Sequence, residues 1–578
     1  QRLRILSNIK ASEKSKKAFR RITTALGKTC GGLVKLIAPN ADGIEVTMTD
    51  KEQIHDRLLT RNFTHYGQAN ETYFGANGGS AHLIDPDNPT NISDKLLEGS
   101  AEFDIQHLSP EAREWLGCLV RNPTEDISVE ISEEDYIRHY KSMPEKKSSS
   151  PSGLHVGHRI VAARADNGLL RRLDVKIAQL AIWAAAPLPR WGQCILTMLE
   201  KPGKGPYLEK LRIIQLVESD LNFVLGLIWG KRLGKKVVLD KSIEATQFAT
   251  RGKLCNSAAL TTCLFNDIHR QTRDPAATAM LDAKACFDRN LPALSIPVSQ
   301  KFGIPQDAAL FLFRTLRAMH FRIRTAHGTS VKSFSAMDNP AEPLQGFGQG
   351  AAESPGLHTC TADISNKALT KHHHGALLQH PDRSVPPVRQ QKSLFMDDTS
   401  LYMNLEAIPA RLMKKHGWSK ATAAAQALQH LIQTYSQYLW TTGGRLSLDK
   451  CYWYLLQYVR HKDGKYRMVG TAQSTFNMEI REVAADGCTV TVPQLEPGDA
   501  RRGLGIVGAP DGSQSAQKRV LLHKATSWAQ SIRASSLHVM EIWTAYSSVL
   551  MPGLRYPLAV TSLSIGDLRA VQQRVSKI

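Results

Sequence analysis

Two short apolar segments that meet aspartates constrain the fold of this chain more than any other feature of its sequence. Residues 276–282 (AATAMLD) have the composition of a buried strand that ends at Asp282. Residues 393–405 (SLFMDDTSLYMNL) place two apolar arms on either side of an acidic turn at Asp397 and Asp398, which is typical of a β-hairpin. Because such strands alternate with helical stretches over much of the chain, the sequence predicts the α+β class.

The three aspartates form a candidate metal site. An Asp-Asp pair alone is common and usually marks a solvated turn, so the pair is a weak signal until its neighbours are considered. Carboxylate oxygens are hard ligands that suit Mg²⁺, and nucleotidyl transfer uses two such ions, about 4 Å apart, that carboxylates bridge. Asp282, Asp397 and Asp398 are therefore the candidate ligands for this chemistry.

The charge of the chain indicates a polyanionic partner. Its 73 Lys and Arg residues exceed its 53 Asp and Glu residues, which gives a formal net charge of +20 and a pI near 9.5. Such an excess on a globular protein commonly faces nucleic acid, although generic solubility charge gives the same composition. No apolar run approaches the roughly 20 residues of a membrane-spanning helix, so the sequence predicts no membrane partner.

The cysteines and histidines give no metal-binding array. Nine cysteines are scattered singly, without a Cys-x-x-Cys pair or zinc-finger spacing. This pattern predicts a reducing, intracellular compartment, with nucleus and cytoplasm not distinguished, and it excludes an ordinary zinc knuckle. His155 and His158, and the tract from His372 to His374, lack a third ligand in the sequence around them, so we interpret them as structural or exposed histidines.

Five segments around the aspartates resemble motifs A to E of reverse transcriptases in order and approximate spacing. They are LDAKACFDR (281–289), GQGAAESPG (348–356), FMDD (395–398), GGRLSLDK (443–450) and GLG (503–505). Upstream, residues 200–222 resemble the Lys-Pro-Gly turn and following strand of the fingers in non-LTR retrotransposon enzymes, and SSSPSGL (148–154) lies where that family has Pro-Gly-x-Asp-Gly. The resemblance covers residues 148–578 and is closest to non-LTR retrotransposon and retroelement-derived reverse transcriptases.

The resemblance implies a right-hand polymerase that copies RNA into DNA. Its partners would be an RNA template, a DNA primer and dNTPs, and its cofactor two Mg²⁺ ions, with Mn²⁺ as an alternative. In that family Asp282 and Asp397 are the metal ligands, and Asp398 contributes to metal or primer-end placement. Lys450 of motif D would be the general acid that protonates the leaving pyrophosphate, and an exposed lysine in a turn is the plainer interpretation.

Further positions of the resemblance would contact the nucleotide and the primer. Lys201 and Arg212 correspond to fingers cations that grip the triphosphate, and Lys204 or Lys210 could take the lysine role. The other positions are Gln349 and Gly350 of motif B, under the incoming base; Phe287, whose ring would exclude a ribose 2′-hydroxyl; and Gly503, Leu504 and Gly505 of the primer grip. Residues 247–258 lack the Gly and Pro of the family's segment, which leaves the role of Arg251 open.

The sequence predicts four regions, with a Ser-rich break at residues 144–153 as the main boundary. By the resemblance, residues 1–145 are a mostly helical N-terminal extension, 146–275 the fingers, 276–510 the palm with interleaved fingers elements, and 511–578 the thumb. Capping signals in the extension occur at Thr49 with Glu52, Ser109 with Pro110, and Ser132 with Asp135. Residues 375–391 are predicted to be a surface loop, and the start without Met predicts a cut within a longer polypeptide.

Two other functions remain compatible with the same motifs. An RNA-dependent RNA polymerase shares the palm and the metals, but it places an Asn in motif B where this chain has Ser354 and Pro355. A maturase-like or scaffold protein would use the fold only to hold RNA, and the complete set of aspartates argues against it. No segment resembles an endonuclease or a ribonuclease H, so we expect neither activity from these residues.

Overall fold

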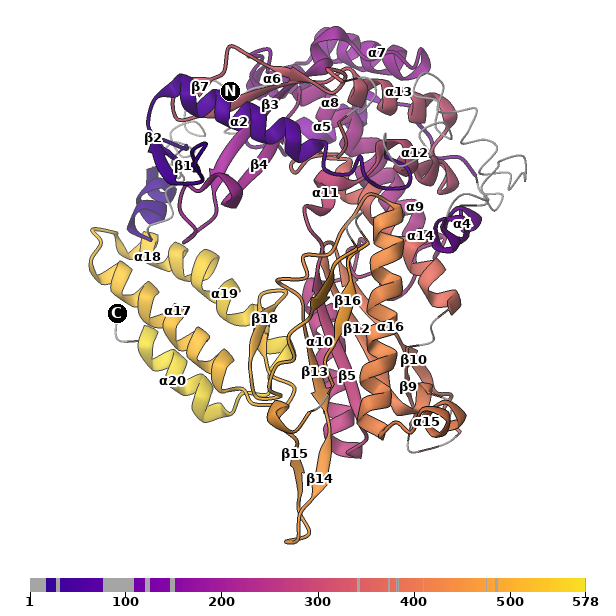
Figure 1. The fold of residues 1–578 in the computed structure, drawn as a ribbon. Helices are drawn as coiled ribbons and strands as arrows, with labels where there is room; N and C mark the ends of the chain where they lie inside the picture. Colours follow the sequence, from indigo (N-terminus) through magenta and orange to yellow (C-terminus); the bar gives the residue numbers. More distant parts are fainter. Residues whose placement is uncertain are drawn as a thin grey trace.

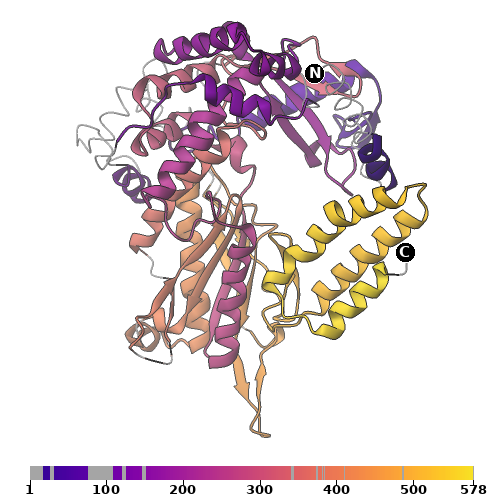
Figure 2. The same ribbon diagram turned by 180° about the vertical axis from the view of Figure 1, so that it is seen from behind.

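The structure is a computed structural model, and Figure 1 shows its three parts. An upper lobe lies above a lower lobe built on a sheet, and a bundle of C-terminal helices lies on the opposite side of the view from that sheet; Figure 2 shows the same parts from behind. The described residues are 17–26, 32–75, 109–119, 125–145, 151–339, 344–372, 375–380, 382, 384–408, 410–474, 476–483 and 487–576.

The lower lobe contains a four-stranded antiparallel sheet in the order β11-β12-β5-β13. Its strands are β5 (Ala276–Asp282), β11 (Lys392–Phe395), β12 (Asp398–Asn404) and β13 (Tyr452–Leu456). The predicted strand and hairpin are therefore confirmed, with β5 ending at Asp282 as expected.

The pleat of β5 sends alternate side chains to opposite faces of this sheet. Ala277 and Ala279 are fully buried in the main hydrophobic cluster, together with Leu428 and Leu431 of α16 (Lys420–Thr441). Ala276 instead packs with Phe265 of α10 (Cys255–Thr272) on the other face. Asp282 has the same parity as Ala276, so its carboxylate belongs to the face that α10 covers.

The upper lobe contains a mixed five-stranded sheet in the order β4-β3-β6-β7, with β8 also paired to β6. Strand β3 is antiparallel to β4 and parallel to β6. The strands are β3 (Gln193–Glu200), β4 (Leu211–Leu216), β6 (His320–Thr325), β7 (Gly328–Thr329) and β8 (Phe334–Ser335). Burial alternates along β4, where Leu211, Ile213 and Gln215 are buried and Arg212 is exposed, so one face of this strand joins the core.

Helices join the two lobes into one body. Buried side chains from Leu33 to Val492 form one continuous hydrophobic cluster that includes both sheets. Besides α10 and α16, this body includes the helices α7 (Leu169–Trp183), α8 (Ser219–Leu225), the π-helix η4 (Gly226–Leu233), α9 (Gly234–Leu239), α11 (Cys286–Arg289), α12 (Pro292–Lys301), α13 (Gln306–Arg317), α14 (Ser354–His372) and α15 (Ala410–His416). It also includes two hairpins of short strands, β14 (Tyr458–Arg460) with β15 (Tyr466–Met468) and β16 (Glu479–Arg481) with β17 (Thr489–Thr491).

The N-terminal region packs on both lobes, against the upper sheet and against α14 and α16. It contains the hairpin β1 (Leu36–Pro39) and β2 (Glu45–Met48), followed by α2 (Lys51–Tyr66), α4 (Pro110–Gly117), α5 (Glu133–Lys141) and α6 (Val156–Arg164). Ser109 caps α4 and Ser132 forms a capping box with Asp135, as predicted. The prediction of Thr49 as a cap was wrong, because the Asp50 carboxylate instead accepts the Gln53 N–H at 2.9 Å.

The C-terminal bundle follows the hairpin of β18 (Arg501–Gly503) and β19 (Ile506–Gly508). Its helices are α17 (Ser515–Arg533), α18 (Val539–Ala545), η7 (Tyr546–Leu550), α19 (Met551–Arg555), η8 (Tyr556–Val560) and α20 (Ile565–Val575). Two small clusters hold the bundle, one around Trp528 and one around Leu521. The helical segment 17–25 also packs here, because Ile22 is buried in the Trp528 cluster and Arg21 pairs with Glu541 at 3.1 Å.

The architecture agrees with a mixed α and β class. The predicted surface loop at 375–391 is partly wrong, since β9 (Ala376–Leu378) and β10 (Val388–Gln390) form an antiparallel ladder within it. Helix α17 lies in the region 511–578 that was predicted to be the thumb, and it carries both basic and apolar residues. In the described part of the chain, we find no helix with the length and apolar character needed to cross a bilayer.

Candidate active site

The end of the lower sheet brings two aspartates directly opposite each other. Asp282, the last residue of β5, pairs in register with Asp398, the first residue of β12. Directly opposed residues of an antiparallel pair have Cβ atoms about 5 Å apart on the same face. Met396 and Asp397 form the two-residue turn that closes the hairpin, with Met396 in the left-handed region at φ 57°. The Asp397 carbonyl accepts the Ala283 N–H at 3.3 Å, which fixes the turn beside Asp282.

The three carboxylates influence each other electrostatically. Partial desolvation, followed by repulsion from Asp397 and Asp282, raises the pKa of Asp398 to about 6. The donor set consists only of carboxylate oxygens, which suits a hard divalent cation. Among the described residues, however, no three His, Cys, Asp or Glu side chains stand in an arrangement ready to hold a metal ion.

Lys450 contacts Asp282. Its Nζ lies 3.0 Å from Asp282 Oδ2, and its side chain is otherwise largely exposed. The preceding loop lies along the end of β5, because the Ser447 N–H donates to the Asp282 carbonyl at 2.8 Å and the Lys284 N–H donates to the Arg445 carbonyl at 2.8 Å. The loop of the predicted motif D therefore holds its lysine against the predicted metal ligand.

A basic end of the upper sheet lies across from these acids. Lys201 follows β3 and Arg212 lies on β4. Burial lowers the pKa of Lys201, and repulsion from Lys450, Arg212 and Arg61 lowers it further, while Asp282 opposes the shift. Lys201 is thus near enough to Lys450, Arg212 and Asp282 for their charges to act on its ammonium group. Lys210 instead lies 4.4 Å from the centre of the Tyr207 ring.

The segment before α14 packs closely against β4. The Gln215 N–H donates to the Gln349 carbonyl at 2.7 Å. Gly350 has φ 110°, and a Cβ there would lie 2.8 Å from the Gln215 carbonyl oxygen, so this position requires glycine. The Ser354 hydroxyl donates to the carbonyls of Phe347 at 3.1 Å and Gly348 at 3.0 Å, which holds the turn that leads into α14.

Phe287 lies on α11, the one-turn helix that follows Asp282. Ala285 enters this helix in the left-handed region at φ 49°, which turns the chain sharply away from the strand. The half-buried Phe287 ring packs edge-on against His358 of α14, with ring centres 5.2 Å apart. Part of the ring therefore remains exposed.

The β18–β19 hairpin borders the same region. Leu504 and Gly505 form its two-residue turn with φ 50° and 81°, as expected for a type I′ turn. The Tyr556 hydroxyl donates to the Leu504 carbonyl at 2.8 Å, which ties Gly503, Leu504 and Gly505 to the bundle.

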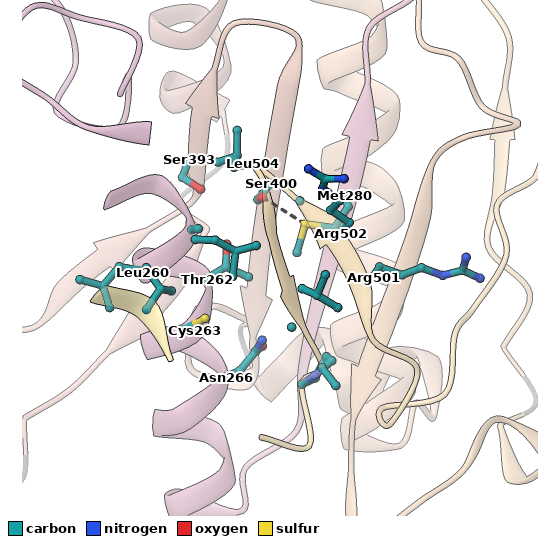
Figure 3. Close-up of a pocket in the computed structure, with 18 of the residues that line it drawn as sticks. Leu260, Thr262, Cys263, Asn266, Met280, Ser393, Ser400, Arg501, Arg502 and Leu504 are labelled. Atoms are coloured by element: carbon teal, nitrogen blue, oxygen red, sulfur yellow. Dashed lines mark hydrogen bonds between the residues drawn. The ribbon is translucent and has the colours of Figure 1, made fainter. Parts of the chain in front are cut away.

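A pocket of about 460 Å³ lies between this hairpin, α10 and the sheet, and its lining includes Asp282, Asp398, Lys450 and Leu504. In Figure 3, Leu260, Cys263 and Asn266 reach it from α10, and Met280 and Ser400 reach it from neighbouring strands.

Several residues near the site had no recognisable signal in the sequence. Arg61 and His65 come from α2, a helix of the predicted N-terminal extension. Arg501 and Arg502 line the pocket directly before the GLG segment, and their position in β18 could have indicated them. Glu353, between Gln349 and α14, is fully buried, and burial raises its pKa to about 7.

The pocket lining leaves out several predicted residues, among them Lys201, Lys204, Arg212, Arg251, Phe287 and Gln349. The His155 ring accepts the Gly157 N–H and caps α6, and His372 pairs with Glu114, which agrees with structural roles; His373 and His374 lie outside the described residues. In the bundle, Lys518 pairs with Asp567 and Lys524 donates to the Gly553 carbonyl at 3.3 Å, so both face neighbouring helices.

Comparison with known proteins gives no relative: no protein-family model matches the chain, and no curated protein matches it significantly.

Proposed function

We propose that this chain is an RNA-directed DNA polymerase of retroelement origin, with the lower sheet as palm, the upper lobe as fingers and the C-terminal bundle as thumb. The observation that carries the proposal is the cross-strand pair of Asp282 and Asp398, contacted by Lys450 and faced by Lys201. Acids that bind cations and bases that bind phosphates are the two requirements of nucleotidyl transfer, and here they occur at one site.

Asp282, Asp397 and Asp398 would hold two Mg²⁺ ions. When bound, the ions activate the primer 3′-hydroxyl and neutralise the charge on the departing pyrophosphate. The raised pKa of Asp398 supports this assignment, because cations would relieve the repulsion from Asp397 and Asp282 that contributes to the shift.

The basic residues would handle the triphosphate. Arg212 presents a forked guanidinium to phosphate oxygens, and Lys201 adds a point charge. As the primer oxygen bonds to the α-phosphorus and the bond to pyrophosphate breaks, the Lys450 ammonium would donate a proton to the leaving group. Its contact with Asp282 keeps it within the site before the substrate enters.

The remaining predicted residues would position base, sugar and primer. The Gln349 and Gly350 backbone, held against β4, would support the incoming base, and the Phe287 ring would lie beneath its sugar. The turn of Leu504 and Gly505 would hold the primer end, and exposed Arg519 on α17 would meet duplex phosphates.

Primer extension with purified protein tests this proposal. RNA and DNA templates are each paired with a DNA primer and offered dNTPs or rNTPs, with Mg²⁺ or with EDTA. We expect dNTP-dependent extension on RNA that EDTA abolishes. Extension with rNTPs alone would establish an RNA polymerase instead, and tight RNA binding without extension by either nucleotide would establish a scaffold.

A further inference from the structure

Helix α2 contacts the turn that carries Phe287. His65, in the last turn of α2, places its Nε2 2.9 Å from Asp288 Oδ2, although the two residues lie 223 positions apart in the chain. The His65 side chain is 19% exposed and the Asp288 side chain 8%. The Oδ1 atom of Asp288 is buried without a hydrogen-bond partner among the described residues. Among the described residues, His65 is therefore the side chain that forms a hydrogen bond with the Asp288 carboxylate.

The other side of the same turn is fixed by the segment before α14. The Phe347 N–H donates to the Phe287 carbonyl at 3.0 Å, and the Gln345 N–H donates to the Tyr66 carbonyl at 2.9 Å. A Cβ at Gly346 would lie 2.7 Å from the Asp288 carbonyl oxygen, so the two backbones are in close contact. The α11 turn is thus enclosed between α2 and residues 345–347.

The next residue shows a second link to the N-terminal region. Arg289 is 1% exposed, and its Nε donates to the Gly443 carbonyl at 2.7 Å. Its Nη2 lies 3.6 Å from Oε1 of Glu71, a residue just beyond α2. Arg289 thus ties the turn to the loop that carries Lys450, residues 345–347 hold its backbone, and His65 contacts the Asp288 side chain.

We propose that His65 is a positioning residue which, through Asp288, sets the place of the Phe287 ring and thereby the choice between dNTP and rNTP. The proposal rests on the function proposed above. A steric gate discriminates by a clash, so a displacement of the ring by a fraction of an ångström changes selectivity more than it changes turnover. Without His65 the buried Asp288 carboxylate loses its described partner, and the turn must move to hydrate it.

Single-nucleotide extension on one template measures this effect. The readout is kcat/KM for dNTP divided by kcat/KM for the matching rNTP. We expect His65→Ala to lower this ratio about tenfold, with dNTP turnover falling much less. His65→Gln keeps an N–H donor near the position of Nε2 and should restore most of the ratio. Asp288→Ala should lower the ratio similarly, and the double variant should lose no more than either single variant.

His55→Ala is the matched control. His55 is another histidine of α2; it is buried, and its Nε2 contacts Thr325 Oγ1 of the upper sheet at 3.0 Å. If a general loosening of α2 were the cause, His55→Ala would lower selectivity equally, and the proposal would be overturned.

Two further outcomes separate this inference from the function itself. A wild-type protein that extends primers while His65→Ala remains fully selective overturns the inference alone. A wild-type protein that extends with neither nucleotide overturns the proposed function and the inference together.

Discussion

The two sheets of this protein contribute opposite charges to the candidate site. Asp282 and Asp398 lie at the end of the lower sheet, whereas Lys201 directly follows β3 of the upper sheet and Arg212 lies on β4. Burial is the main cause that raises the pKa of Asp398 and lowers the pKa of Lys201, and like-charged neighbours add to both shifts. The acidic end suits cations and the basic end suits anions, so substitutions at the two ends should affect different steps.

The largest effect should come from the acidic end. Asp282→Asn or Asp397→Asn should reduce primer extension by about a thousandfold or more, because these carboxylates act on the chemical step. Template-primer affinity, measured by fluorescence anisotropy, should change little. Asp274→Asn is the control, since Asp274 is an exposed carboxylate next to the opposite end of β5. If either site variant extended primers at a rate within a few-fold of wild type, the acidic end would not act on the chemical step, and the contrast between the acidic and basic ends would fail.

Substitution of Phe287 should have the next largest effect. Phe287→Val should lower discrimination against rNTPs by about 100-fold, because a ribose 2′-hydroxyl would no longer clash with the ring. Competition assays with mixed dNTP and rNTP pools measure this ratio. If the Val variant stays as selective as wild type, Phe287 is only a core aromatic packed on His358.

Substitution at the basic end should act on substrate binding. Arg212→Ala should raise KM for dNTPs about tenfold, as expected for the loss of a charge-assisted phosphate contact, and should reduce kcat less. Lys210→Ala serves as the control, because that lysine stacks on Tyr207. A selective loss of kcat in Arg212→Ala would show that the basic end acts on chemistry as well.

The smallest effect should come from Glu353, a buried acid of the upper lobe. Its substitution should change the stability of the fold and leave catalysis unchanged. Burial raises the pKa of Glu353 from 4.5 to about 7. The folded state therefore favours the protonated Glu353 carboxyl over the carboxylate. The stabilisation that comes from this group is fully present below pH 4.5, and it is lost as the pH rises through about 7. Glu353→Gln should raise the unfolding temperature by several degrees at pH 8 and leave it unchanged at pH 4. Equal shifts at both pH values would show that packing is responsible.

The sequence predicted those features that depend on local signals. The end of β5 at Asp282, the hairpin of β11 and β12, and the cap at Ser109 each follow from residues within a few positions. Thr49 failed as a cap because its neighbour Asp50 offers a competing acceptor at the same helix start. The ladder of β9 with β10 was missed because its strands are three residues long and separated by Pro-containing chain.

The contacts that complete the site could not be predicted in this way. His65 meets Asp288 only because α2 packs on the upper sheet and ends beside α11, and nothing near His65 in the sequence marks that destination. Arg289 appeared within a recognised motif, but its burial against Gly443 depends on the path of a loop more than 150 residues later. Tertiary packing between distant segments decides both contacts.

The helical segment 17–25 limits how far the C-terminal bundle can swing. Ile22 is anchored in the bundle, while the Leu33 carbonyl accepts the Ala326 N–H at 3.0 Å in the upper lobe. The chain from Leu26 to Gly32 can span at most about 20 Å when fully extended. A wider excursion must pull Ile22 out of its cluster, at about 2 kcal/mol for exposing one large aliphatic side chain. The N-terminal chain therefore sets a maximum separation between the C-terminal bundle and the upper lobe.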